Sequence, residues 1–187
     1  MRVEDRQGRP TALRGASTLE MGEYRNEAAS AGSAKTAMTE ILFYHLQRQP
    51  LERVLPTLLE KSLERGWRVV VQAASEERAE ALDAHLWTFR DDSFLPHGTW
   101  REAEARAQPI LLTVHDDNPN GASVRFLLDG VPLPADVATY DRIVLLFDGE
   151  DPDAVDVARV RWSEAKQNGF EVTYWQPDEA GRWQRKA

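Results

Sequence analysis

From residue 38 onward, apolar runs typical of β-strands alternate with segments whose apolar residues have helical spacing. The runs are rich in β-branched and aromatic residues, and they predict strands at 41–46, 67–72, 110–114, 124–128 and 142–147. Helices are predicted at 51–65, 75–87 and 151–168. Strands that alternate with helices indicate an α/β domain, in which helices cover a largely parallel sheet.

Glycine, proline and short polar residues mark where these elements begin and end. Gly66 is expected to stop the first helix, and Pro56 to mark its start or a kink. Ser75 can cap the second helix, and Asp151, which is followed by proline, can cap the third. The tail from residue 171 has two runs around a turn, which predicts a hairpin at one edge of the sheet. Residues 88–108 have no regular pattern, so we expect irregular structure there.

The first 37 residues have a different composition from the rest. They contain scattered Arg and Glu, a stretch of small residues at 28–37 and few large apolar side chains. Such a segment buries too little surface to offset the entropy of ordering it, which predicts a flexible extension. A mis-assigned start codon is the alternative, because Met38 directly precedes the first strand. The expected organisation is therefore an extension at 1–37 and one α/β domain at 38–187.

Composition restricts the classes of function. The 187 residues include no cysteine, which excludes disulfides, thiol nucleophiles and thiolate zinc sites and is typical of the reducing cytoplasm. No apolar run approaches the roughly 20 residues of a membrane-spanning helix, so we expect no contact with a membrane. The formal net charge is −8, whereas proteins that grip the DNA backbone are usually basic. We therefore expect any role in DNA metabolism to involve DNA only indirectly, through other proteins.

Motifs for nucleotide binding and catalysis are missing. The sequence contains no GxGxxG or P-loop motif, no GxSxG nucleophile elbow and no HExxH pair, so no cofactor is expected. The best enzyme candidate is an acidic group after the strand at 142–147, comprising Asp148, Glu150, Asp151 and Asp153. Carboxylates at this position can hold magnesium, which leaves a magnesium-dependent phosphoryl-transfer enzyme using Asp148 and Asp151 as an alternative. The same acids can instead cap the following helix.

The last helix arranges its side chains in distinct faces. At about 100° per residue, Val157, Ala158 and Ala165 lie within ~60° of Ala154, and we expect this face to pack on the sheet. Arg161 falls inside the same apolar arc, which the spacing does not explain.

A mixed stripe lies along one border of that apolar face. Val155, Arg159, Trp162 and Lys166 cluster at ~80–140° from Ala154. Arg can hold a carboxylate by two hydrogen bonds, Lys adds a point charge, and indole offers a flat apolar surface. The stripe therefore suits a short acidic peptide that ends in an aromatic residue. The alternative is an ordinary amphipathic helix whose tryptophan lies in the core and whose cations reach solvent.

A second candidate surface lies between Leu86 and His97. Trp87, Phe89, Phe94 and Leu95 are large apolar residues in a region without a clear secondary-structure pattern. If they are exposed, they form a protein-binding patch. If they are buried, they extend the core, and the sequence leaves both possibilities open.

Several segments between Met38 and about Trp175 together carry a family resemblance: FYHL, RGWRVVV, LDAHLW, SFLPHG and ARVRWSEAKQNGF. In this order they resemble the chi subunit family of bacterial DNA polymerase III. The resemblance implies a Rossmann-like, three-layer α/β domain without bound nucleotide and without catalytic activity of its own. It also implies a cytoplasmic, replisome-associated protein.

The resemblance implies two sets of partner-binding residues. Arg159, Trp162 and Lys166, with Val155 beside them, match positions that bind the acidic, phenylalanine-terminated tail of single-stranded-DNA-binding protein. The family also pairs with the psi subunit, which connects it to the clamp loader. Residues matching an interface with psi, or with an alternative helicase partner, are Trp87, Phe94 and Leu95.

The chain departs from the family pattern at Val155 and Ser163, where basic residues are often found. We therefore expect a less positive tail site, with weaker or more salt-sensitive binding.

Overall fold

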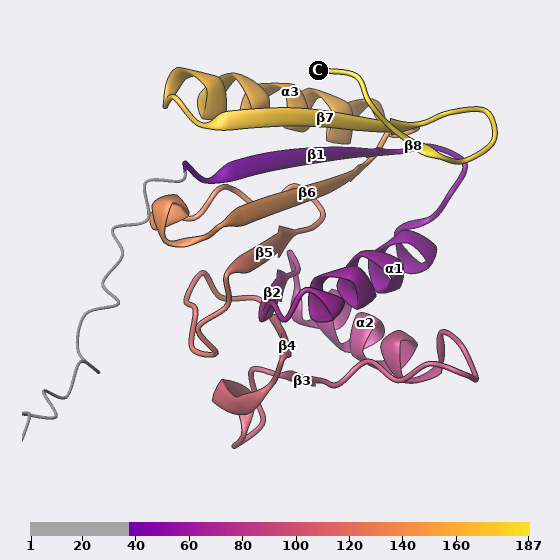
Figure 1. Ribbon diagram of the computed structural model, residues 1–187, viewed down its shortest axis with the longest axis vertical. Helices are drawn as coiled ribbons and strands as arrows, with labels where there is room; N and C mark the ends of the chain where they lie inside the picture. The colour runs from indigo at the N-terminus through magenta and orange to yellow at the C-terminus, as the bar shows by residue number, and fades with distance from the viewer. Residues whose placement is uncertain (1–37) are drawn as a thin grey trace, which may run out of the picture. The chain divides into compact units, whose positions relative to one another are not determined.

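The apolar runs form one eight-stranded sheet in the computed structural model, which describes residues 38–187 (Figure 1). The strands are β1 (Glu40–Leu46), β2 (Val69–Gln72), β3 (His97–Thr99), β4 (Ile110–Thr113), β5 (Val124–Leu127), β6 (Arg142–Asp148), β7 (Glu171–Pro177) and β8 (Trp183–Arg185). Their order is β3-β4-β2-β5-β6-β1-β7-β8. All neighbours are parallel except β7 and β8, which form the predicted antiparallel hairpin.

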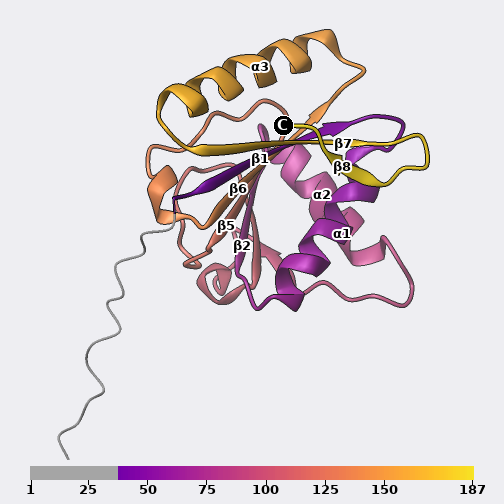
Figure 2. The same ribbon diagram turned by 45° about the horizontal axis from the view of Figure 1, so that its top comes forward.

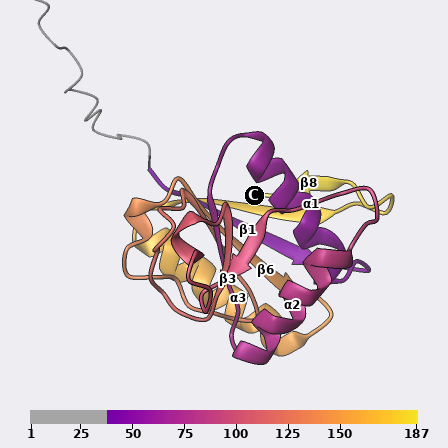
Figure 3. The ribbon, with the colours of Figure 1, turned by 90° about the horizontal axis from the view of Figure 1, so that it is seen from below.

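Helices cover both faces of this sheet. The helices α1 (Leu51–Glu64) and α2 (Glu76–Thr88) pack on one face, and α3 (Pro152–Gln167) packs on the other (Figures 2 and 3). Two short 3-10 helices lie at Ala105–Ala107 and Val137–Thr139. The predicted α/β class, with its largely parallel sheet and its edge hairpin, is confirmed. None of the helices in residues 38–187 is long and apolar enough to cross a membrane.

Local capping determines the helix ends much as the sequence predicts. The Ser75 hydroxyl accepts a hydrogen bond from the Arg78 amide at 3.2 Å, and the Asp151 carboxylate accepts one from the Asp153 amide at 2.9 Å. Gly66 has a φ of +74°, and its amide donates to the Leu63 carbonyl at 2.8 Å, which ends α1.

Pro56 lies inside α1 rather than at its start. A proline cannot donate to the carbonyl four residues earlier, which here belongs to Glu52. His85 of α2 supplies that hydrogen bond instead, with 2.8 Å between its Nε2 and the Glu52 oxygen. The carbonyl left without a helical partner therefore links α1 to α2.

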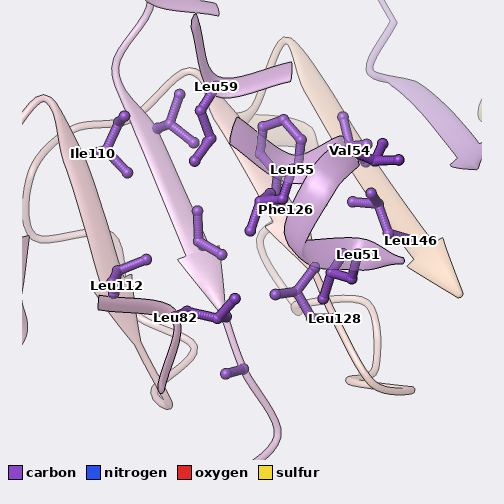
Figure 4. Close-up of a cluster of buried hydrophobic side chains, with 14 of the residues drawn as sticks. Leu51, Val54, Leu55, Leu59, Leu82, Ile110, Leu112, Phe126, Leu128 and Leu146 are labelled. Carbon is purple, nitrogen blue, oxygen red and sulfur yellow. The ribbon is translucent and has the colours of Figure 1, made fainter. Parts of the chain in front are cut away.

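Two main apolar cores lie on the two faces of the sheet. On the α1 and α2 side, Leu55 and Leu59 of α1 pack with Phe126 of β5 and with side chains of β2, β4 and β6 (Figure 4). On the α3 side, Ile41 and Phe43 pack with Ala158 and Ala165 and with β6 and β7. Because strand side chains alternate, residues 41 and 43 of β1 face α3 while residues 42 and 46 face α1.

A buried arginine occupies the part of the sheet next to the α3 core. Arg125 of β5 is 0% exposed, and its guanidinium donates to Gln72 Oε1, the Tyr140 hydroxyl and the carbonyls of His115 and Asp117. These are hydrogen bonds to neutral acceptors only, at 2.6–3.2 Å. They join the loop after β4 to strands β2 and β5.

The structure differs from the sequence-based expectations for the fold at strand β3 and at Val157. Strand β3 lies inside the stretch predicted to be irregular, where it pairs in parallel with β4. Val157 was predicted to face the sheet with Ala158 and Ala165, but it is 38% exposed, whereas the two alanines are buried. The extension or mis-assigned start predicted for residues 1–37 lies outside the described residues.

Candidate functional site

One edge of α3 carries the predicted stripe of charged and aromatic side chains. Ala158 and Ala165 are buried against the sheet and fix the rotation of the helix about its axis. Steps of three and four residues then bring a set of side chains into line along the edge that faces β7. We call this set the α3 edge surface: Val155, Arg159, Trp162 and Lys166.

Trp162 is the half-buried centre of the α3 edge surface. Its ring meets Phe43 of β1 edge-on, with centroids 5.2 Å apart, and Tyr174 of β7 edge-on at 6.0 Å. The Lys166 ammonium lies 5.4 Å from the Trp162 ring centroid, within reach of a cation–π interaction. One side of the Trp162 ring is thus part of the core, and the other side is available to solvent.

Arg159 projects into solvent and has a weak partner. Its guanidinium donates to Asp156 at 2.8 Å, and the two side chains are 75% and 72% exposed. Exposed pairs of this kind contribute about 0–1 kcal/mol. Burial raises the pKa of Tyr174, while the positive charge of Arg159 acts on it in the opposite direction. Arg159 lies three residues before Trp162 on α3, and the Trp162 ring contacts Tyr174 edge-on.

His45 supports this surface from beneath. Its Nδ1 and the Tyr174 hydroxyl form a short hydrogen bond, and its ring stacks on Phe147 with centroids 5.1 Å apart. Burial lowers the pKa of His45, while the Gly149 backbone and the Asp148 carboxylate act in the opposite direction. A side chain added at Gly149 would overlap the His45 ring and approach the Leu46 carbonyl to 2.7 Å. Glycine at 149 therefore allows His45 to hold Tyr174 in position.

The segment from Trp87 to Leu95 separates into exposed and buried parts. Trp87 and Phe94 are 55% and 69% exposed, and their ring centroids lie 5.9 Å apart. Trp87 also contacts the buried His97 ring, with centroids 4.8 Å apart. Leu95 is only 2% exposed and belongs to the core, so it has no free surface for a partner. The predicted interface is thus reduced to Trp87 and Phe94, which we call the Trp87–Phe94 patch.

The acidic group at the end of β6 accepts hydrogen bonds from nearby backbone amides. Asp148 accepts a hydrogen bond from the Glu150 amide at 2.8 Å, and Asp151 caps α3. Within residues 38–187, no three acidic, histidine or cysteine side chains converge as metal ligands would. These carboxylates line a cavity of about 780 Å³ at the carboxyl ends of β1, β5 and β6. Arg161, unexplained by the sequence, lines the same cavity and pairs with Glu164 at 2.9 Å.

Comparison with known proteins identifies the family. The sequence model described as "DNA polymerase III chi subunit, HolC" matches residues 38–173, which is more than half of the chain. The protein belongs to the DNA polymerase III chi subunit family. The resemblance noted in the sequence is therefore confirmed.

Two curated relatives agree with this assignment to the chi family. The chain is 29% identical over 136 residues to "DNA polymerase III subunit chi" of Pseudomonas aeruginosa, covering 71% of this chain and 93% of the relative. It is 26% identical over 121 residues to "Probable DNA polymerase III subunit chi" of Rickettsia prowazekii, covering 59% of this chain and 71% of the relative.

The chi-family match contains the α3 edge surface and the Trp87–Phe94 patch, but it ends before Tyr174 and β8. Sequence reasoning missed His45 and Tyr174 as supports of the α3 edge surface. The spacing of either residue within its own strand carries no signal, because their contact joins positions 129 residues apart. Tyr174 could have been found only by pairing the strands, since it lies in register with Phe43 of β1.

Proposed function

We propose that this chi-family protein acts in DNA replication as a non-catalytic subunit of the bacterial DNA polymerase III holoenzyme. In this proposal the α3 edge surface binds the acidic, phenylalanine-terminated tail of single-stranded-DNA-binding protein, and the Trp87–Phe94 patch binds the psi subunit or an alternative helicase partner. The protein thereby links the clamp loader to protein-coated single-stranded DNA. The observation that carries the proposal is the Lys166 ammonium over the Trp162 ring, on the same helix edge as Arg159.

The chemistry of the α3 edge surface is complementary to such a tail. An aromatic side chain of the peptide can pack against Trp162 and Tyr174, whose rings are already edge-on to one another. The peptide carboxylates can pair with Arg159 and Lys166. Because the Arg159–Asp156 pair is exposed and weak, Arg159 can exchange Asp156 for a peptide carboxylate at little cost in free energy.

The limited number of cations predicts a weak interaction that added salt weakens further. Val155 is half-buried and packs on the α3-side core, and Ser163 accepts a hydrogen bond from Gln167 at 3.1 Å. Neither supplies positive charge. Exposed charges are screened over about 8–10 Å at physiological salt, so the two cations act only on carboxylates close to them.

The Trp87–Phe94 patch supports a second protein contact. Large aromatic residues that are more than half exposed are uncommon on a protein with no partner, and tryptophan is enriched at the energetic centres of interfaces. The patch lies at the end of α2 and in the following loop, whereas the α3 edge surface lies on the other face of the sheet. Separate faces allow both partners to bind together.

Calorimetric titration with an acidic, phenylalanine-terminated peptide tests the proposed tail site. Arg159→Glu should weaken binding by about 1–3 kcal/mol, because it replaces an attractive charge with a repulsive one. The matched control is Arg53→Glu on α1, an exposed arginine on the opposite face of the sheet, which makes the same change in net charge. Equal affinities for the Arg159→Glu and Arg53→Glu proteins would reject the α3 edge surface as the binding site.

A further inference from the structure

The C-terminal arm lies beyond the part of the chain that matches the chi family, yet it completes the sheet beside the α3 edge surface. Strand β8 pairs with β7, placing Arg185 opposite Trp175. Backbone hydrogen bonds continue past β8: the Lys186 amide donates to the Tyr174 carbonyl at 2.8 Å, and the Tyr174 amide donates to the Ala187 carbonyl at 2.9 Å. Lys186 and Ala187 thus both bond to Tyr174, just beyond the regular β7–β8 pairs, which end at Trp175 and Arg185. Figures 1 and 2 both draw this end of the chain beside β7.

Aromatic packing holds the arm in place on the opposite face of the sheet. Trp183 meets Tyr44 of β1 edge-on, with ring centroids 4.9 Å apart, and Tyr44 stacks on Trp175 at 6.0 Å. These rings pack against the core under α1. The position of the residues that follow Trp183 is thus fixed by buried contacts as well as by strand pairing.

Strand alternation assigns the two basic residues of the arm to different faces. Residues that lie opposite one another in an antiparallel pair project to the same face, and neighbours along a strand project to opposite faces. Arg185 lies opposite Trp175 and therefore projects to the α1 face. Lys186 directly follows Arg185, and its backbone bonds to Tyr174, so alternation continued from β8 places it on the α3 face, where the Tyr174 ring is edge-on to Trp162.

No side-chain carboxylate of residues 38–187 pairs with the two lysines on this face. Among the described residues, neither Lys166 nor Lys186 forms an ion pair, and Arg159 pairs only with the exposed Asp156. Lys186 itself is exposed. Lys166 thus lies at the Trp162 ring, Arg159 lies on the same helix edge, and Lys186 is bonded through its backbone to Tyr174, in a chain whose formal net charge is −8.

We propose that Lys186 is a third cation of the peptide site, which extends from α3 across β7 to the C-terminal arm. This inference rests on the proposed function. Neighbouring strands are about 4.8 Å apart and an extended peptide advances about 3.3 Å per residue, so the step from β7 to β8 spans one or two peptide residues. Lys186 therefore pairs with carboxylates upstream of the terminal aromatic residue, while Arg159 and Lys166 hold the chain end.

Fluorescence anisotropy with two labelled peptides tests this assignment. Both end in phenylalanine preceded by aspartate, and in the second peptide the acids further upstream are replaced by serine. Lys186→Glu should weaken binding of the all-acidic peptide about tenfold at low salt, but weaken binding of the serine-substituted peptide less than about twofold. Arg185→Glu makes the same charge change on the adjacent residue and the other face, and it should alter neither affinity by more than about twofold.

The outcomes separate this inference from the proposed function. If the intact protein binds the all-acidic peptide and Arg159→Glu weakens that binding, but Lys186→Glu and Arg185→Glu have equal effects, the arm is not part of the site. Equal losses for both peptides in the Lys186→Glu protein would likewise overturn the assignment to upstream carboxylates. If the intact protein binds neither peptide, the proposed function itself fails. Thermal melts of each variant exclude unfolding as the cause, since both substituted side chains are exposed.

Discussion

Arg125 should contribute to stability without contributing to partner binding. Replacing it with methionine keeps much of the buried volume but removes all five hydrogen bonds of the guanidinium. Two buried side-chain acceptors, Gln72 and Tyr140, then lose this donor. Each acceptor left unsatisfied lowers the free energy of unfolding by about 1–3 kcal/mol. Removing a buried charge offsets part of that cost. We therefore expect Arg125→Met to lower the free energy of unfolding by about 2–5 kcal/mol.

Urea unfolding measures this change directly, with the slope m checked against that of the unaltered protein. Arg125→Lys should not restore stability, because one ammonium has three donors at a single point and cannot reproduce the planar arrangement of five. The control is Arg182→Met, at a 77% exposed arginine paired with Asp178, which should cost less than about 1 kcal/mol. A loss below about 1 kcal/mol for Arg125→Met would refute the reasoning. Tail-peptide affinity should be retained, since none of these hydrogen bonds involves the α3 edge surface.

Two further predictions concern His45, which supports the α3 edge surface, and Phe94, which belongs to the Trp87–Phe94 patch. Because burial lowers the pKa of His45 below its ordinary 6.5, the unfolded chain binds this proton more readily. The contribution of the neutral His45 ring to the free energy of unfolding is therefore complete above pH 6.5. It is lost as the pH falls through the lowered pKa, because the unfolded chain takes up the proton first. Melting temperatures between pH 8 and 5 should fall less steeply in a His45→Gln protein, and identical slopes would contradict this. Phe94→Ala should change stability by less than about 0.5 kcal/mol yet reduce co-purification with psi, and unchanged co-purification would remove Phe94 from that interface.

Much of the fold was predictable because its signals are local. The capping of α3 by Asp151 and the stop of α1 at Gly66 depend on residues within one helical turn, and both appear as expected. Strand β3 was missed because it is only three residues long and exists through its pairing with β4, from which it is separated by ten residues. A strand defined by a distant partner leaves no periodic pattern of its own.

The candidate site was predictable in spacing but not in burial. The helical repeat placed Arg159, Trp162 and Lys166 on one edge, as the structure has them. The repeat does not show which face of α3 lies against the sheet. In the structure the buried face of α3 is rotated toward Trp162, which packs on Phe43. Val157 therefore lies at the exposed border. The two alternatives for the tryptophan, core residue or binding surface, both apply to Trp162 in part.

The same limit applies to the segment after α2. Trp87, Phe94 and Leu95 are equally apolar, and a stretch without periodicity does not show which side chain faces the core. The fold places Leu95 under α2 and leaves the two aromatic rings outside.

The central claim is that a cationic and aromatic helix edge captures an acidic chain end. It is tested most directly by the dissociation constants of this protein for intact single-stranded-DNA-binding protein and for the same protein lacking its last few residues. The account predicts measurable binding to the intact protein at low salt, which weakens as salt is added and is lost when the tail is removed. Equal affinity for both forms would contradict it.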